Sequence, residues 1–89
     1  MINIFVNKSF EEMIGKFSEK DKEIINKSLN KIIHGKKPIL KRIPSSDLYA
    51  KKINGVVLIF SKKEKGLYLM DIMKREEFEK EFRKSIFLF

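Results

Sequence analysis

The sequence predicts an α+β domain in which two N-terminal helices pack on a mainly antiparallel, twisted sheet. Apolar residues recur with helical spacing between positions 10 and 33. Two runs of strand-forming residues then flank Asn54 and Gly55, and a third such run covers 67–73. Because the helical patterns come first and the strand patterns follow, the predicted element order is β-α-α-β-β-β-α.

Length and composition limit the classes of protein to consider. The 89 residues suit a single domain spanning 1–89, with room for one small core. There is no cysteine and only one histidine, His34, which argues against disulfides, thiolate metal sites and a histidine-based metal site. No apolar run approaches the roughly 20 residues that cross a bilayer. We therefore expect a cytoplasmic protein that uses neither metal nor cofactor and does not bind membranes.

The N-terminal third predicts a short strand followed by two helices. Apolar residues alternate over 2–6, as in a strand with one face inward. Ser9 and Glu12 have the spacing of a capping box, which predicts a helix start there. Ser18 precedes a second helical pattern, which Gly35 ends as the predicted C′ residue. The few residues between the helices predict an antiparallel hairpin of helices covering the sheet. His34 in the last turn is read as a favourable cation at the helix end, with proton transfer as the alternative.

The middle of the chain predicts the strongest element, a β-hairpin over 47–60. Asn54 and Gly55 suit a type I′ turn, because both residue types accept positive φ angles. Residues 56–60 are continuously apolar, which predicts a strand buried on both faces. The connector at 36–44 carries two prolines and is expected to be extended, with a short strand possible at Ile39 and Leu40.

The C-terminal third predicts a third strand and a short helix. After a polar turn at 62–66, the alternation over 67–73 assigns Tyr68, Met70 and Ile72 to one face and Asp71 to the other. Phe78 and Phe82 then share one side of a helix predicted over 75–84. The apolar tail at 85–89 is either part of the core or a surface for a partner.

Positive charge is concentrated in one quarter of the chain. The formal net charge is +8, and residues 31–52 contain seven lysines or arginines against one acid, Asp47. Such a concentration attracts a polyanion such as nucleic acid, or an acidic protein. A lysine-rich solvated surface is the alternative interpretation.

No common catalytic signature is present, so any chemistry must come from lysine, arginine, carboxylates and aromatic side chains. RNA can be cleaved with such a set, because its own 2′-hydroxyl is the nucleophile. Lys51, Lys52, Lys74 and Arg75 are the candidates for stabilising the charge on the phosphate.

The sequence that contains these residues resembles those of the RelE/ParE superfamily of bacterial and archaeal toxin–antitoxin toxins. The likeness covers nearly the whole chain and rests on four loose motifs: Leu40-Lys-Arg-Ile43, Leu48-Tyr-Ala-Lys-Lys-Ile53, the apolar run 56–60 and Lys74-Arg75-Glu76. The resemblance implies a toxin that cleaves messenger RNA on the ribosome, as a metal-independent endoribonuclease that blocks translation. It also implies a cognate antitoxin as partner.

In that family, basic residues after the connector and after the last strand bind and polarise the messenger phosphate. The resemblance therefore implies catalytic roles for Lys52 and Arg75. Substrate-binding roles fall to the nearby basic residues Lys51, Lys74, Lys41 and Arg42.

Three positions depart from the family pattern and leave other functions open. Val57 stands where the apolar strand usually carries an arginine, and Phe78 and Phe82 stand where a tyrosine is common. A ParE-like inhibitor that binds gyrase or another protein is therefore one alternative. A basic nucleic-acid-binding module without toxicity is another.

Each candidate residue also has a purely structural interpretation. Lys51 and Lys52 must point to opposite faces of a strand, so at most one of them enters a given site. Arg75 has Glu79 at i+4, which is the spacing of a weak surface ion pair.

Overall fold

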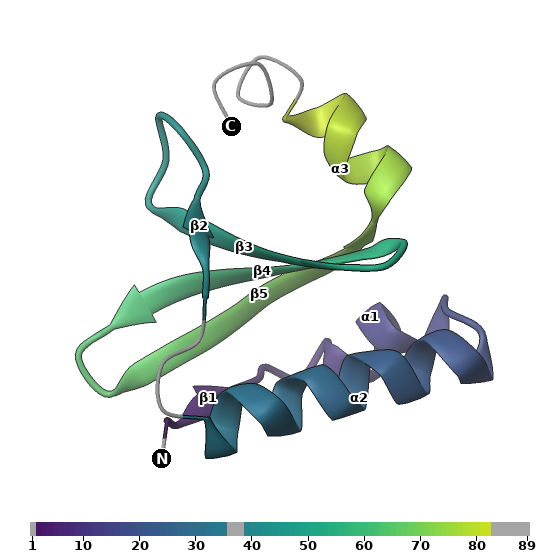
Figure 1. Ribbon diagram of the computed structural model, residues 1–89, viewed down its shortest axis with the longest axis horizontal. Helices are drawn as coiled ribbons and strands as arrows, with labels where there is room; N and C mark the ends of the chain where they lie inside the picture. The colour runs from purple at the N-terminus through teal and green to yellow at the C-terminus, as the bar shows by residue number, and fades with distance from the viewer. Residues whose placement is uncertain (1, 36–38, 83–89) are drawn as a thin grey trace.

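The computed structural model describes residues 2–35 and 39–82. Its elements are β1 (Ile4–Phe5), α1 (Phe10–Gly15), α2 (Glu19–His34), β2 (Lys41–Arg42), β3 (Leu48–Ile53), β4 (Val56–Lys63), β5 (Gly66–Lys74) and α3 (Arg75–Glu81). The α+β class is confirmed, with α1 and α2 on one side of the sheet and α3 on the other (Figure 1). Among these residues, no helix has both the length and the apolar composition that crossing a membrane requires.

The sheet has five strands in the order β1-β5-β4-β3-β2. Three of its four pairings are antiparallel, and β1 pairs with β5 in parallel. The predicted order contained four strands. The fifth is the two-residue β2, which lies at Lys41–Arg42, two positions later than the strand suggested at Ile39 and Leu40.

The two N-terminal helices begin in different ways. The Ser18 side chain accepts a hydrogen bond from the Asp21 backbone N–H at 3.2 Å, so the predicted start of α2 is confirmed. The capping box at α1 is wrong, because Ser9 makes no side-chain cap. The Asn7 side chain instead accepts hydrogen bonds from both the backbone N–H and the hydroxyl of Ser9, and this local turn replaces the cap.

Helix α2 ends at His34, as predicted, but the role of Gly35 differs. Gly35 is the C-cap residue with φ −81° and ψ 162°, an extended conformation open to any residue. A Cβ at this position would lie 2.6 Å from the Lys31 carbonyl oxygen. Glycine is therefore required by close contact with the last helical turn, and not by the left-handed conformation of a C′ residue.

Each face of the sheet has its own apolar core, and strand β4 contributes to both. The helix-side core, packed under α1 and α2, contains Phe17, Ile25, Leu29, Ile32, Val56, Leu58, Phe60, Leu67, Leu69 and Ile72. The opposite core, packed under α3, contains Ile43, Ala50, Val57, Ile59, Met73 and Phe78. All five residues 56–60 are at most 2% exposed, which confirms a strand buried on both faces.

The β3–β4 hairpin has the predicted register but a different turn. Ile53 pairs with Val56, so Asn54 and Gly55 form the two-residue loop. Asn54 has a φ of 51°, whereas Gly55 is not among the residues with positive φ. A type I′ turn needs positive φ at both central residues, so the type I′ prediction is wrong.

Strand β5 contains a bulge that changes the predicted faces. Ile59 pairs with Asp71 but Phe60 pairs with Leu69, which leaves Met70 without a cross-strand counterpart. Alternation restarts after this extra residue. Consequently Ile72 joins Leu67 and Leu69 in the helix-side core instead of sharing a face with Tyr68 and Met70.

Helix α3 begins at Arg75 as predicted and is described as far as Glu81. Phe78 is fully buried, and its ring centroid lies 5.0 Å from that of the half-buried Phe82. Residues 83–84 of the predicted helix and the apolar tail at 85–89 lie outside the described residues.

Candidate functional site

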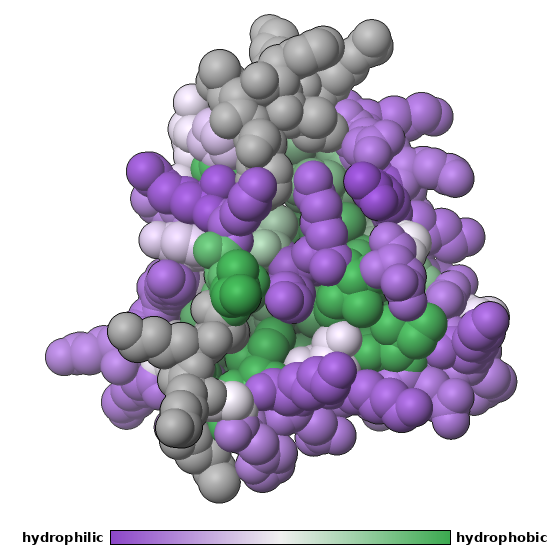
Figure 2. Space-filling view, viewed as in Figure 1, coloured by the Kyte–Doolittle hydropathy of each residue, from purple (hydrophilic) through white to green (hydrophobic). Residues whose placement is uncertain are grey.

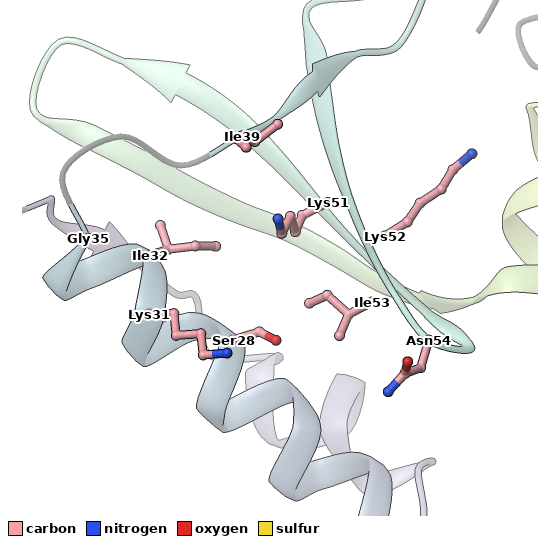
Figure 3. Close-up of a pocket in the computed structure, with 9 residues that line it drawn as sticks. All are labelled: Ser28, Lys31, Ile32, Gly35, Ile39, Lys51, Lys52, Ile53 and Asn54. Carbon is pink, nitrogen blue, oxygen red and sulfur yellow. The ribbon is translucent and has the colours of Figure 1, made fainter.

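Lys51 and Lys52 are neighbours on β3 whose side chains point to opposite sides of the sheet. Lys51 pairs with Leu58 of the helix-side core, and Lys52 pairs with Val57 of the opposite core. Directly opposed residues of an antiparallel pair share a face, so the two side chains must diverge. Figure 3 shows Lys51 extending toward α2 and Lys52 extending away from it.

Lys52 belongs to the side of the sheet that carries α3. Its Nζ lies 5.6 Å from the centroid of the Phe78 ring, within the range of a cation–π interaction. Phe78 is fully buried against the core that contains Val57 and Met73. The exposed side chain of Lys52 is thus held beside the first turns of α3.

Arg75 lies at the start of α3, which is attached to the hairpin turn. Its backbone N–H donates a hydrogen bond of 2.9 Å to the Gly55 carbonyl oxygen. This bond places Lys52, three residues before Gly55, and Arg75 at the same end of the sheet. The Arg75 guanidinium Nε lies 3.4 Å from Oε1 of Glu79, and both side chains are more than half exposed. The predicted i,i+4 ion pair is confirmed.

The surroundings of Arg75 are less positive than the sequence suggested. A hollow of about 390 Å³ is lined by Asp21, Asn54, Gly55, Lys74, Arg75, Glu76 and Glu79. Three carboxylates therefore face two cations, so this hollow is a weak attractor for phosphate. Lys74, a predicted substrate-binding residue, shares it with Arg75.

The positive charge gathers instead around β3. One hollow of about 230 Å³ brings together Lys41, Lys51 and Lys52 with Ile39 and Ala50. A second, of about 510 Å³, is lined by Lys31, Lys51 and Lys52 among apolar and neutral residues. Among the described residues that line these two hollows, none is acidic. Three of the predicted site residues are thus close together. Lys31 joins them as a member of the basic stretch 31–52 that was not predicted as a site residue.

Arg42 has a local structural role. Its Nε donates a hydrogen bond of 2.9 Å to the Ser46 carbonyl oxygen, within the loop that joins β2 to β3. Ser46 in turn donates from its hydroxyl to the Ile43 carbonyl oxygen at 2.7 Å. Two side-chain donors thus bond to carbonyls of one tight loop, and Arg42 is not among the residues that line the two hollows.

Two of the three departures from the family pattern lie in the interior. Val57 and Phe78 are each fully buried in the opposite core. Their side chains supply neither a charge nor a proton to a ligand. In the described part of the chain there is also no group of three or more histidine, cysteine or acidic residues arranged to hold a metal ion.

Sequence reasoning identified Glu79 beside Arg75 but not the other acidic neighbours, Glu76 and Asp21. Glu76 and Glu79 are close in sequence, but Asp21 comes from the first turn of α2, more than 50 positions away. The only signal for Asp21 was its place near a helix start, which the hairpin turn approaches in three dimensions.

Comparison with known proteins gives a structural match alone. No protein-family model matches the sequence, and no curated protein matches it. The fold is similar to that of a chain in the crystal structure of the RelB–RelE antitoxin–toxin complex from Methanococcus jannaschii, with a TM-score of 0.69 and 9% sequence identity. The match covers 83% of this chain and 93% of that chain. The two chains share their fold.

Proposed function

We propose that this chain is the toxin component of a type II toxin–antitoxin system, and that it acts as a RelE-like endoribonuclease on ribosome-bound messenger RNA. The observation that carries the proposal is the fold shared with a chain of an antitoxin–toxin complex over most of both chains. A cognate antitoxin is the proposed protein partner, and the cytoplasm is the proposed location. Lys52 and Arg75 are the residues proposed to act on the RNA.

The geometry around the hairpin turn supports a shared role for these two cations. Lys52 precedes the turn and Arg75 is bonded to it through Gly55, so both are anchored to one rigid element. The ion pair between Arg75 and Glu79 is solvent-exposed. Such pairs contribute only about 0.3–0.5 kcal/mol, so a phosphate group can displace the carboxylate at little cost.

The proposed chemistry uses the nucleophile that RNA already carries. The 2′-hydroxyl gives its proton to water as its oxygen forms a bond to the adjacent phosphorus. The bond from phosphorus to the 5′-oxygen breaks, and that oxygen takes a proton from water, which leaves a cyclic phosphate and a free 5′-hydroxyl. Negative charge builds up on the phosphoryl oxygens during this step. An ammonium and a guanidinium held beside those oxygens stabilise the transition state more than the ground state.

The test is primer extension on translated messages after induced expression. We expect new 5′ ends with the wild-type chain, and their loss with Lys52→Ala or Arg75→Ala. Lys63→Ala is the matched control, because Lys63 is an exposed lysine at the far end of β4 and should leave cleavage unchanged. Full growth arrest with intact messages would contradict the endoribonuclease proposal.

A second candidate is an inhibitor that binds a protein target such as gyrase. Val57 and Phe78 favour it, because both side chains are buried and neither offers a charge or a hydroxyl to RNA. Purified chain added to a gyrase supercoiling assay separates the two: inhibition without RNA cleavage favours the second candidate. A non-toxic nucleic-acid-binding module would leave growth unaffected while binding RNA with a strong salt dependence.

A further inference from the structure

A groove lies between α2 and the outer part of β3, on the side of the sheet away from α3. Its volume is about 510 Å³, and it is lined by Ser28, Lys31, Ile32, Gly35, Ile39, Lys51, Lys52, Ile53 and Asn54. Figure 3 shows residues of α2 and residues of β3 facing one another across it. Apart from Lys52, whose side chain extends away from α2 in Figure 3, none of these residues is among those proposed to act on RNA.

The groove results from the way β2 and α2 end. The ladder between β2 and β3 contains only the pairs Lys41–Ala50 and Arg42–Tyr49, so β2 does not cover β3 beyond Ala50. Helix α2 lies beneath this part of β3 and ends at His34. The space between the helix and the strand is therefore open to solvent.

The groove exposes aliphatic surface. Ile39 is 78% exposed, Ile53 is half-buried, and Ile32 at 4% exposure contributes to the floor. In Figure 2, apolar surface is visible between the hydrophilic side chains of this region. An aliphatic ligand group would remove this surface from water, which favours binding by about 25 cal/mol per Å² buried.

The rim of the groove is positively charged. Lys31 lies on α2 and Lys51 on β3, and no carboxylate is among the lining residues. In the described residues, neither ammonium lies within ion-pair distance of a carboxylate. The adjoining hollow shares Ile39 and Lys51 with the groove and adds Lys41. A ligand with negative charge beside its apolar groups would match this arrangement.

The lining distinguishes a peptide from a nucleic acid. Single-stranded RNA binds to basic grooves in which aromatic side chains stack with the bases. The described residues that line the groove and the adjoining hollow include isoleucines and no aromatic residue. We propose that this groove binds a segment of a partner protein in which aliphatic side chains are flanked by carboxylates. The inference does not depend on ribonuclease activity, since binding is measured directly.

The test begins with a phage-displayed library of random peptides about ten residues long, enough to span the 32 Å long axis of the molecule when extended. Peptides are selected on the wild-type chain and depleted on a Lys31→Glu, Lys51→Glu double variant. We expect the retained sequences to combine Asp or Glu with Ile, Leu or Val. Resynthesised peptides should bind the variant about tenfold or more weakly in fluorescence anisotropy, a change of about 1.4 kcal/mol or more.

The matched control is a Lys20→Glu, Lys63→Glu double variant. It carries the same net charge as the first variant but changes exposed lysines outside the groove. Peptide affinity for this control should stay within about twofold of wild type, because only local charge is proposed to matter. Circular dichroism melting curves of both variants verify that the chains are folded.

Three results would overturn the proposal. One is a selection that enriches no peptide containing carboxylates. The second is equal affinity for both double variants, which means that net charge alone drives binding. The third is an oligouridylate that depends on Lys31 and Lys51 when no selected peptide does, since the groove would then bind nucleic acid.

Discussion

At the scale of residues, the adjacent lysines of β3 show how one dipeptide serves two surfaces. Lys51 and Lys52 are consecutive, so strand geometry sends them to opposite sides of the sheet. Lys52 lies beside the ring of Phe78, and Lys51 lies at the rim of the groove under α2. A substitution at one position should therefore affect one surface and spare the other.

The salt dependence of RNA binding tests this division. Each phosphate contact on a single strand contributes about 0.7 to the slope of log affinity against log salt concentration. Lys52→Met keeps the stem that packs near Phe78 but removes the charge, so the slope should fall by about 0.7. Lys51→Met should leave it unchanged. The measurement is a titration of oligouridylate by fluorescence anisotropy at several salt concentrations, and equal losses of slope in both variants would contradict the division.

The candidate site was predictable only in part at this scale. The roles of Lys52 and Arg75 stay predictions, which the family resemblance implies from their places after the connector and after the last strand. That Arg75 faces Glu79 was readable from the i,i+4 spacing, and the structure confirms it. The sequence does not predict that Asp21 lies near Arg75, because this depends on where the start of α2 lies relative to the hairpin turn.

At the scale of elements, the contact of β1 with β5 depends on one glycine. Gly66 begins β5 with a φ of 152°, and a Cβ there would lie 2.4 Å from the Asn3 carbonyl oxygen. That carbonyl accepts a hydrogen bond from the Leu67 N–H at 2.9 Å. The close approach of the two backbones therefore leaves no room for a side chain.

We accordingly expect Gly66→Ala to destabilise the protein by about 1–3 kcal/mol, through displacement of β1 and the strained φ. Gly15→Ala is the matched control, because a Cβ at Gly15, the last residue of α1, meets no atom within 4 Å. Alanine in a helix is better than glycine by roughly 0.5–1 kcal/mol, so the control should be neutral or stabilising. Urea denaturation followed by circular dichroism measures both changes. A neutral Gly66→Ala would show that β1 docks without this close approach.

Elements that depend on residues close together in the sequence were predicted well. Features that depend on contacts between distant segments were not. The hairpin register followed from Asn54 and Gly55, and α2 followed from its apolar spacing and from Ser18. The bulge at Met70 arises from pairing between β4 and β5, which alternation within one strand does not contain. Strand β2 was placed two residues early, because its position depends on the loop built around Arg42 and Ser46.

At the scale of the whole molecule, two cores share the central strands β4 and β5, and every residue from 56 to 60 on β4 belongs to one core or the other. Val56, Leu58 and Phe60 contribute to the helix-side core, while Val57 and Ile59 contribute to the opposite core. Neither core can keep its packing if β4 leaves the sheet. The chain should therefore unfold in one cooperative transition, with both faces lost together.

Native-state hydrogen exchange tests this dependence along the chain. Amides of residues 56–60 should exchange only through global unfolding, with an opening free energy equal to that from denaturant titration, because every one of their side chains is buried. Amides of α1 should open at a lower free energy, since this six-residue helix has no buried residue. The measurement is deuterium exchange followed by NMR at increasing urea concentrations below the transition.

If α1 were protected as strongly as β4, the helical layer and the sheet would open only as a unit. If residues 56–60 exchanged below the global value, the two cores would not depend on their shared strand.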